Sequence, residues 1–240
     1  MFDFLMPAQT PTHAPLTLVD IGAAGGIQQK WLRHGKRIRP VLFEANPAEA
    51  ARLRALSPSM PDVMVVPQGL AAIAGDYTLK LAHWPGCSSL LEADPEVLAG
   101  YGIAPLYSTV GHVDVHCERY DALHRAGLVP QPDVVKIDVE GYEYEVLCGF
   151  GELLHDVLGI ETEAWFYPVF KGQKLLHDLV TLLARFGLHL RRIEAVDGFE
   201  GDLVCVNAYF TRGKAGRARL STAQRSHFML LHQVWRLNAA

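Results

Sequence analysis

Two short runs of this chain have residue types and spacing that could do chemistry. The first is Asp20 to Gly26 (DIGAAGG) and the second is Lys136 to Gly141 (KIDVEG). Small residues after an apolar run let the backbone come close to a ligand. Three ionisable residues in alternate positions at the end of an apolar run are costly to bury unless they are paired or functional. The sequence therefore predicts a ligand cradle next to a charged reaction site.

The first run is typical of a nucleoside cradle, to which we assign Asp20, Gly22, Ala23, Ala24 and Gly26. The G-x-G-x-x-G spacing of dinucleotide enzymes is absent, because Ala24 occupies the second glycine position. That favours a nucleoside without a pyrophosphate. Glycine-rich turns also occur for packing reasons, so this turn alone identifies no ligand.

Glu44 ends a second apolar run about two dozen residues after Gly22, where a carboxylate can accept hydrogen bonds from both hydroxyls of an adenosine ribose. The alternative is an acid that stabilises the helix beginning at Pro47. We prefer the ribose role because both the spacing and the position at a strand end are met. Its neighbours Ala45 and Asn46 are included in the site, and Gly69 and Leu70 are placed to line the adenine.

In the second run, strand alternation puts Lys136, Asp138 and Glu140 on one face if the strand continues that far. A lysine and carboxylates that neutralise each other are the structural alternative. Glu161 and Glu163 end a later strand, share a face, and should approach the same crevice. We take Asp138, Glu140 and Glu163 as candidates for the group that accepts a proton from a substrate.

The elements that must position these residues alternate between strand and helix patterns. Strands are predicted at 17–21, 39–44, 63–66, 133–138, 158–162, 188–193 and 203–211, and helices at 27–34, 47–56, 142–150 and 175–186. The alternation predicts a doubly wound, Rossmann-like α/β fold, with three α/β/α layers around a mostly parallel seven-stranded sheet that has an antiparallel strand near its edge. Alternating runs at 77–82 and 113–117 are assigned to an added edge and loop region.

The residues resemble the FkbM-type S-adenosylmethionine-dependent methyltransferases. The likeness covers residues 18–193 and runs through VDIGAAGG, FEANP, the loop from Cys87 to Leu91, KIDVEGYEYEVLCG and FYPVFKGQ. It implies S-adenosyl-L-methionine as cofactor, held by Asp20 to Gly26 and by Glu44, with Asp138 beside its sulfonium or amino group. It also implies O-methylation of a hydroxyl in a sugar, glycan or secondary metabolite.

Within the implied site, the substrate-binding candidates are Ser88, Ser89, Glu161, Phe166 and Lys171, the last two from an aromatic stretch that would form one wall of the acceptor pocket. Two other functions stay open. One is an NAD(P)-dependent oxidoreductase, which also uses a glycine turn and an acid after the second strand. The other is a non-catalytic nucleoside-binding module on the same fold.

The composition also limits which partners and which domain organisation we expect. A net charge of -4 gives no reason to expect nucleic acid as a partner. The cysteines and histidines lack metal-ligand spacing, so no metal is predicted, and no apolar run is long enough to span a membrane. We expect a cytoplasmic protein with a flexible segment at 1–16, a methyltransferase domain at 17–211, and a basic segment at 212–240 whose terminal helix, capped by Ser221, packs on that domain. Homo-oligomerisation is compatible with the sequence.

Overall fold

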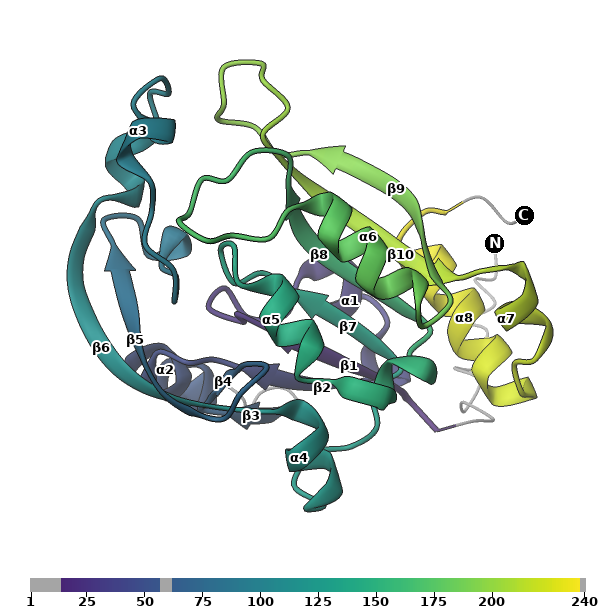
Figure 1. The fold of residues 1–240 in the computed structure, drawn as a ribbon. Coiled ribbons are helices and arrows are strands. Elements are labelled where there is room, and N and C mark those ends of the chain that lie inside the picture. The colour runs from purple at the N-terminus through teal and green to yellow at the C-terminus, as the bar shows by residue number, and fades with distance from the viewer. Residues whose placement is uncertain (1–13, 57–61, 238–240) are drawn as a thin grey trace, which may run out of the picture.

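The computed structural model describes residues 14–56 and 62–237, and a seven-stranded sheet forms its centre (Figure 1). The strands are β1 (Leu16–Ile21), β2 (Ile38–Phe43), β3 (Met64–Val66), β7 (Val134–Ile137), β8 (Gly159–Trp165), β9 (Leu188–Ala195) and β10 (Cys205–Arg212). Their order is β3-β2-β1-β7-β8-β10-β9. All neighbours are parallel except that β10 runs antiparallel to β8 and β9. The predicted sheet, including its antiparallel strand next to an edge, is confirmed.

Helices cover both faces of this sheet, as the apolar central strands require. One face is covered by α4 (Tyr120–Arg125), α5 (Glu143–Cys148) and α6 (Leu176–Ala184), and the other by α1 (Gln29–Leu32), α2 (Pro47–Leu56) and α8 (Thr222–Val234). All six residues of β1 are buried. Each large side chain buried in this way contributes roughly 1.5–3 kcal/mol. The three-layer arrangement follows from these two apolar faces.

The region between β3 and β7 folds differently from the sequence-based prediction. A second sheet contains β4 (Gly69–Leu70), β5 (Gly75–Ala82) and β6 (Thr109–Glu118) in the order β4-β6-β5, with the short helix α3 (Pro95–Leu98) in the β5–β6 connection. The two predicted strands thus pair with each other and do not extend the edge of the main sheet. One face of this small sheet is buried through Leu79, Val115 and Cys117, together with Tyr142 from the main domain.

The helix α8 (Thr222–Val234) packs against the main sheet through its buried residues. The Ser221 side chain accepts a hydrogen bond from the Gln224 amide at 3.2 Å and caps α8, which follows the short helix α7 (Lys214–Ala218). The Trp235 ring after α8 lies edge-on to Trp31 of α1, with ring centroids 6.3 Å apart. Of the expected segment at 1–16, residues 1–13 lie outside the described residues, whereas Leu16 already belongs to β1.

The predicted helix at 27–34 is shorter than expected. Only Gln29–Leu32 is α-helical, and a 3₁₀ turn at Gly35–Arg37 follows, begun by Gly35 at φ +49°. None of the helices in the described parts of the chain combines the length and apolar character that crossing a bilayer requires.

Candidate functional site

A pocket of about 790 Å³ opens at the carboxyl ends of β1, β2 and β7. In doubly wound sheets, ligands bind where the connections of two neighbouring strands leave in opposite directions, which here is between β1 and β7. Most predicted site residues line it: Gly22, Ala24, Gly26, Glu44, Ala45, Asn46, Gly69, Leu70, Ser88, Ser89, Asp138 and Glu140. Residues of the Asp20–Gly26 run and of the Lys136–Gly141 run therefore meet in one pocket.

Gly22 allows the glycine turn to pass directly against the end of β7. Its φ is +75°, and a Cβ atom at this position would lie 1.8 Å from the carbonyl oxygen of Asp138. The amides of Gly22 and Ala23 both donate to the carbonyl of Phe43, at 3.1 and 3.2 Å, so the turn is also fixed to β2. A Cβ on Gly25, in contrast, would meet no atom within 4 Å. The turn is therefore fixed against β2 and β7 at Gly22 and Ala23, whereas Gly25 leaves open space.

Glu44 follows β2 and lines the pocket while only 7% exposed. Its Oε1 atom accepts a hydrogen bond of 2.8 Å from the Asn46 amide, which fixes the carboxylate at the start of α2. Burial raises the pKa of Glu44, and the Asn46 bond opposes that shift. The predicted position at a strand end is therefore met, and the carboxylate is available to a ligand in the pocket.

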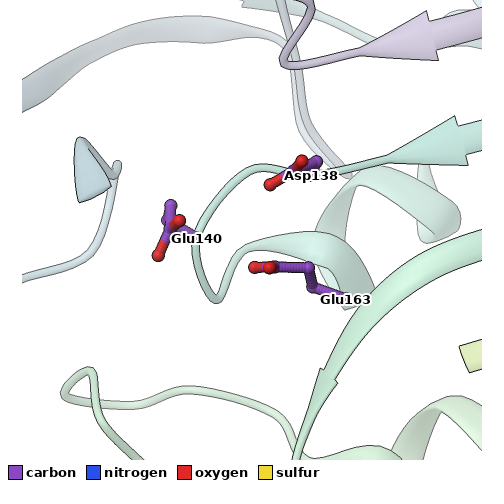
Figure 2. A group of neighbouring side chains, drawn as sticks. All are labelled: Asp138, Glu140 and Glu163. Atoms are coloured by element: carbon purple, nitrogen blue, oxygen red, sulfur yellow. The ribbon is translucent and has the colours of Figure 1, made fainter. Parts of the chain in front are cut away.

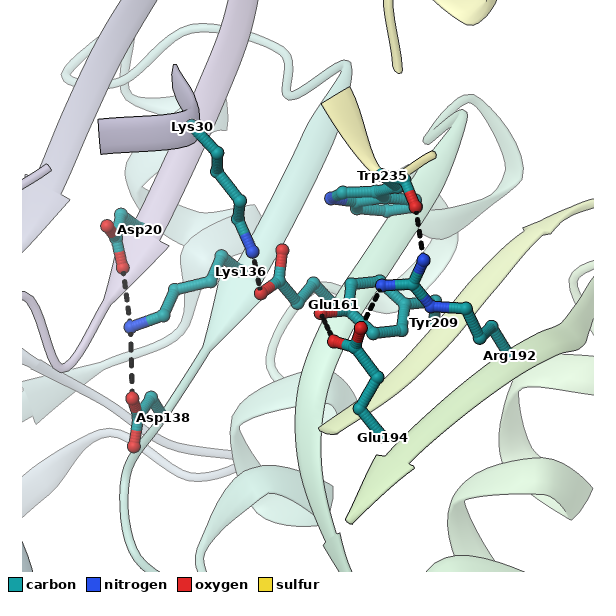
Figure 3. Close-up of polar contacts among 9 residues, drawn as sticks. All are labelled: Asp20, Lys30, Lys136, Asp138, Glu161, Arg192, Glu194, Tyr209 and Trp235. Atoms are coloured by element: carbon teal, nitrogen blue, oxygen red, sulfur yellow. Dashed lines mark hydrogen bonds and ion pairs between the residues drawn. The ribbon is translucent and has the colours of Figure 1, made fainter. Parts of the chain in front are cut away.

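A buried polar row crosses the main sheet below the pocket (Figure 3). Strand register places Asp20 beside Lys136, Lys136 beside Glu161, and Glu161 beside Tyr209. The Lys136 ammonium lies 3.2 Å from a carboxylate oxygen of Asp20 and 3.2 Å from one of Asp138. Burial lowers the pKa of Lys136, but the two carboxylates more than offset this and the pKa is raised overall. Lys136 is therefore held as a cation between two acids.

Two predicted residues lie in this row and do not line the pocket. Burial raises the pKa of Asp20 to about 6 in spite of Lys136, and Asp20 is buried without lining the pocket. Glu161 forms a short ion pair with Lys30 of α1, a partner that the sequence analysis did not identify. Asp20 thus connects β1 to β7 through Lys136, and Glu161 connects β8 to α1 through Lys30.

A tight turn, and not a continued strand, brings Glu140 to the pocket. Strand β7 ends at Ile137, and Glu140 adopts φ +55°, followed by Gly141 at φ +93°. The buried Glu143 carboxylate accepts hydrogen bonds from the amides of Val139 at 3.3 Å and Gly141 at 3.0 Å. The Ser89 hydroxyl donates to the Glu140 carbonyl at 2.6 Å. The strained conformation is thus held from both sides.

Asp138, Glu140 and Glu163 converge on one space from two strand ends (Figure 2). Their carboxylate oxygens lie within 4.8 Å of one another, and among the described residues they form the one such group of acid, His or Cys side chains. Burial raises the pKa of Glu140 well above its ordinary value, and the charges of Glu163 and Asp138 raise it further. Burial and Asp138 likewise raise the pKa of Glu163. Glu140 and Glu163 therefore hold their protons more tightly than ordinary glutamates do.

The remaining predicted residues do not line the pocket, and Glu163 is one of them although it lies next to Asp138 and Glu140. Ala23 is buried behind the glycine turn. Phe166 is 38% exposed, and Lys171 forms a surface ion pair of 2.8 Å with Glu92. Neither lines the pocket, and Trp165 is buried in the core beside Phe170 and Phe199. The expected aromatic wall is absent from the lining.

Several lining residues were not predicted. They include Gln28 and Gln29 after the glycine turn, Glu49 and Arg52 of α2, Pro85 and Gly86 in the β5–β6 connection, and Tyr142 after the turn that contains Glu140. The first four and Tyr142 adjoin predicted motifs, so their proximity in sequence was an available signal. Pro85 and Gly86 directly precede the Cys87–Leu91 motif, but only the second sheet shows that this loop reaches the pocket.

The fold and this pocket define a Rossmann-like domain with a nucleoside-sized site at its switch point. The profile of the methyltransferase FkbM domain matches residues 20–190, and the chain belongs to this family. This match confirms the resemblance to FkbM-type methyltransferases that the motifs indicated. It does not favour the alternative of a nicotinamide-dependent oxidoreductase.

Two relatives illustrate the similarity. Hexuronic acid methyltransferase AglP of Haloferax volcanii is 33% identical over 116 residues, which are 48% of this chain and 42% of that protein. The crystal structure of Methyltransferase FkbM from Methylobacillus flagellatus KT matches with a TM-score of 0.51 and 12% identity, covering 85% of this chain and 46% of that one. The chain spans less than half the length of each.

Proposed function

We propose that this chain is an S-adenosylmethionine-dependent O-methyltransferase that acts on a hydroxyl group of a sugar or glycan. The observation that carries the proposal is that a single pocket joins the Gly22–Gly26 turn and Glu44 to the carboxylate group of Asp138 and Glu140. The family supports methyl transfer, and the relative named a hexuronic acid methyltransferase supports a sugar acceptor.

The residues present fit the cofactor. Gly25 leaves open space at the turn, Glu44 presents a fixed carboxylate for the ribose hydroxyls, and Phe43, Leu70 and Val139 give apolar lining for an adenine. When bound, S-adenosylmethionine supplies an electrophilic methyl group. The chain's own contribution is to align the acceptor and exclude water, which can account for roughly 7–11 kcal/mol of a barrier.

Among the three candidate bases, the geometry favours Glu140. Asp138 is engaged by Lys136, whereas the Oε2 atom of Glu140 is buried without a hydrogen-bond partner, and Glu140 lines the pocket. A carboxylate with a raised pKa is a stronger base once ionised, so Glu140 is suited to accept the proton of the acceptor hydroxyl. Burial raises the pKa of Glu140 most, and the charge of the neighbouring Glu163 raises it further.

Calorimetric titration tests the cofactor assignment. S-adenosylhomocysteine should bind the chain, and Glu44→Gln should weaken that binding roughly tenfold to a hundredfold, because hydrogen bonds to a charged group are worth about 1.5–3 kcal/mol. Glu49→Gln is the matched control, since Glu49 lines the same pocket but is engaged by Arg52. Tight binding of NADH without binding of S-adenosylhomocysteine would contradict the proposal.

The reaction itself is tested with hydroxylated acceptors. Incubation with S-adenosylmethionine and a pool of simple glycosides should give products heavier by one methyl group in mass spectrometry. Cofactor binding without any methylated product would instead support the non-catalytic module.

A further inference from the structure

The acceptor end of the pocket contains carboxylate oxygens that lack partners. Glu140 lines the pocket, and Glu163 lies beside it without being part of the lining. The Oε2 atoms of both are buried and have no hydrogen-bond partner among the described residues. These two side chains and Asp138 face a common space (Figure 2). Buried acceptors without a donor are costly, so this end of the pocket is complementary to a ligand that brings hydrogen-bond donors.

The cations near these carboxylates are already engaged. Lys136 is shared between Asp20 and Asp138, and Lys30 is paired with Glu161 in the row below (Figure 3). The Lys80 ammonium, on β5, donates to the Leu90 carbonyl at 2.7 Å. Lys136, which contacts Asp20 and Asp138, is thus the cation among four carboxyl groups here: Asp20, Asp138, Glu140 and Glu163.

The remaining basic residue of the lining lies at the other end of the pocket. Arg52 donates to the Glu49 carboxylate at 2.9 Å and to the Ala24 carbonyl at 2.6 Å, beside the glycine turn. Every Lys and Arg of the sequence lies in the described ranges 14–56 and 62–237. Within those ranges, Lys136 and Arg52 are the only two that line the pocket, and both have carboxylate partners.

We infer that this site selects an uncharged sugar as methyl acceptor and discriminates against the hexuronic acid of the same stereochemistry. The inference rests on the proposed function and names the substrate class of that site. The hydroxyl groups of a neutral sugar donate to Glu140 and Glu163, whereas a uronate carboxylate faces like charges and meets no unpaired cation. Like-charge contacts of this kind are a common device for rejecting a wrong ligand.

A shared proton on the Glu140 and Glu163 pair does not remove the discrimination. A protonated carboxyl can donate one hydrogen bond, but it adds no positive charge to balance a uronate. Arginine or lysine is the usual partner of a recognised carboxylate, and this end of the pocket provides neither in unpaired form. Neutral hydroxyls remain the better match in either protonation state.

The experiment compares matched acceptors that differ only at C6. Methyl hexosides and the corresponding methyl hexuronides, in gluco, galacto and manno pairs, are assayed for methyl transfer, and their binding to the chain saturated with S-adenosylhomocysteine is measured by calorimetry. Assays contain EDTA, and a parallel set contains Mg²⁺ so that a bridging cation is tested directly. For the pair that is turned over, we expect kcat/KM to be at least tenfold higher for the hexoside, with the binding constants in the same order.

Variants test whether the carboxylates cause the selectivity. Glu163→Gln keeps the shape of the side chain but removes a charge, so the hexoside to hexuronide ratio should fall severalfold, even where turnover of both acceptors changes. Glu92→Gln removes an exposed carboxylate paired with Lys171, away from the pocket, and should leave the ratio unchanged.

The outcomes separate this inference from the proposed function. A preference for the hexuronide, in EDTA or in Mg²⁺, would overturn the inference while methyl transfer to a sugar stood. If Glu163→Gln leaves the hexoside to hexuronide ratio unchanged, the carboxylates are not the cause of the selectivity and the inference is overturned. Binding of S-adenosylhomocysteine with neither binding nor methylation of any sugar would reject the sugar acceptor itself and the inference with it.

Discussion

The ammonium of Lys136 lies 3.2 Å from a carboxylate oxygen of Asp138 and at the same distance from one of Asp20. Asp20 belongs to β1 and Asp138 follows β7, so one buried lysine joins the strand that carries the glycine turn to the turn that carries Glu140. Lys136 therefore links the glycine turn electrostatically to the turn that contains Glu140.

Replacing this lysine should destabilise the fold strongly. Lys136→Met leaves Asp20 buried without a counter-ion, and breaking a buried pair from one side costs about 3–5 kcal/mol. Chemical denaturation should show this loss, and Asp20→Asn in the same chain should recover part of it. Lys171→Met, which breaks an exposed pair with Glu92, should leave the stability nearly unchanged. Equal stability of Lys136→Met and wild type would refute the link.

Glu163→Gln should move the pH profile of methyl transfer. Glu140 must be ionised to accept a proton, so activity rises as pH increases through its raised pKa. Because the Glu163 charge contributes to that raised pKa, removing it should shift the acid limb of kcat/KM to lower pH. The profile of Glu92→Gln should overlay that of the wild type. An acid limb that stays in place in Glu163→Gln would exclude Glu140 as the titrating base.

Stability should depend on pH through Glu143. Burial raises the pKa of Glu143 from 4.5 to about 7, against three backbone hydrogen bonds that lower it. Since the folded pKa lies above the unfolded one, this contribution is fully present below pH 4.5 and is lost as pH rises to about 7. The shift corresponds to about 3 kcal/mol.

The matched variant isolates that contribution. Glu143→Gln keeps an oxygen for the amides of Val139 and Gly141 but does not titrate. Unfolding free energies measured from pH 4 to pH 8 should therefore fall less steeply in the variant than in the wild type. Parallel curves for the two proteins would show that Glu143 is not responsible.

Two glycines of one turn should respond differently to alanine. Gly22→Ala places a Cβ 1.8 Å from the Asp138 carbonyl at a positive φ, so it should lower the melting temperature and abolish binding of S-adenosylhomocysteine. Gly25→Ala meets no protein atom within 4 Å and should fold normally, while its methyl group intrudes on the pocket and weakens binding. Unchanged affinity in Gly25→Ala would place the cofactor elsewhere.

The sequence by itself determined the strands, the glycine turn, Glu44 and the KIDVEG motif. Apolar runs bounded by turn residues are local signals, and the chemistry of a strand end depends on the residues beside it. For this reason most of the residues that line the pocket at the glycine turn and at Glu44 were predicted, and Ser88 and Ser89, which also line it, were predicted from the family motif. The basic final segment likewise contained a helix that Ser221 could be expected to cap.

Only the tertiary structure decided which acids meet. Glu161 and Glu163 lie two residues apart on β8, yet Glu161 is paired with Lys30 while Glu163 joins Asp138 and Glu140. The difference arises from strand register, which sets Glu161 beside Lys136 and Tyr209, and from the left-handed turn that swings Glu140 toward the pocket. Register and long-range pairing depend on contacts between distant segments. Local patterns therefore could not show that the second sheet brings Pro85 and Gly86 to the pocket or that Phe166 and Lys171 stay outside it.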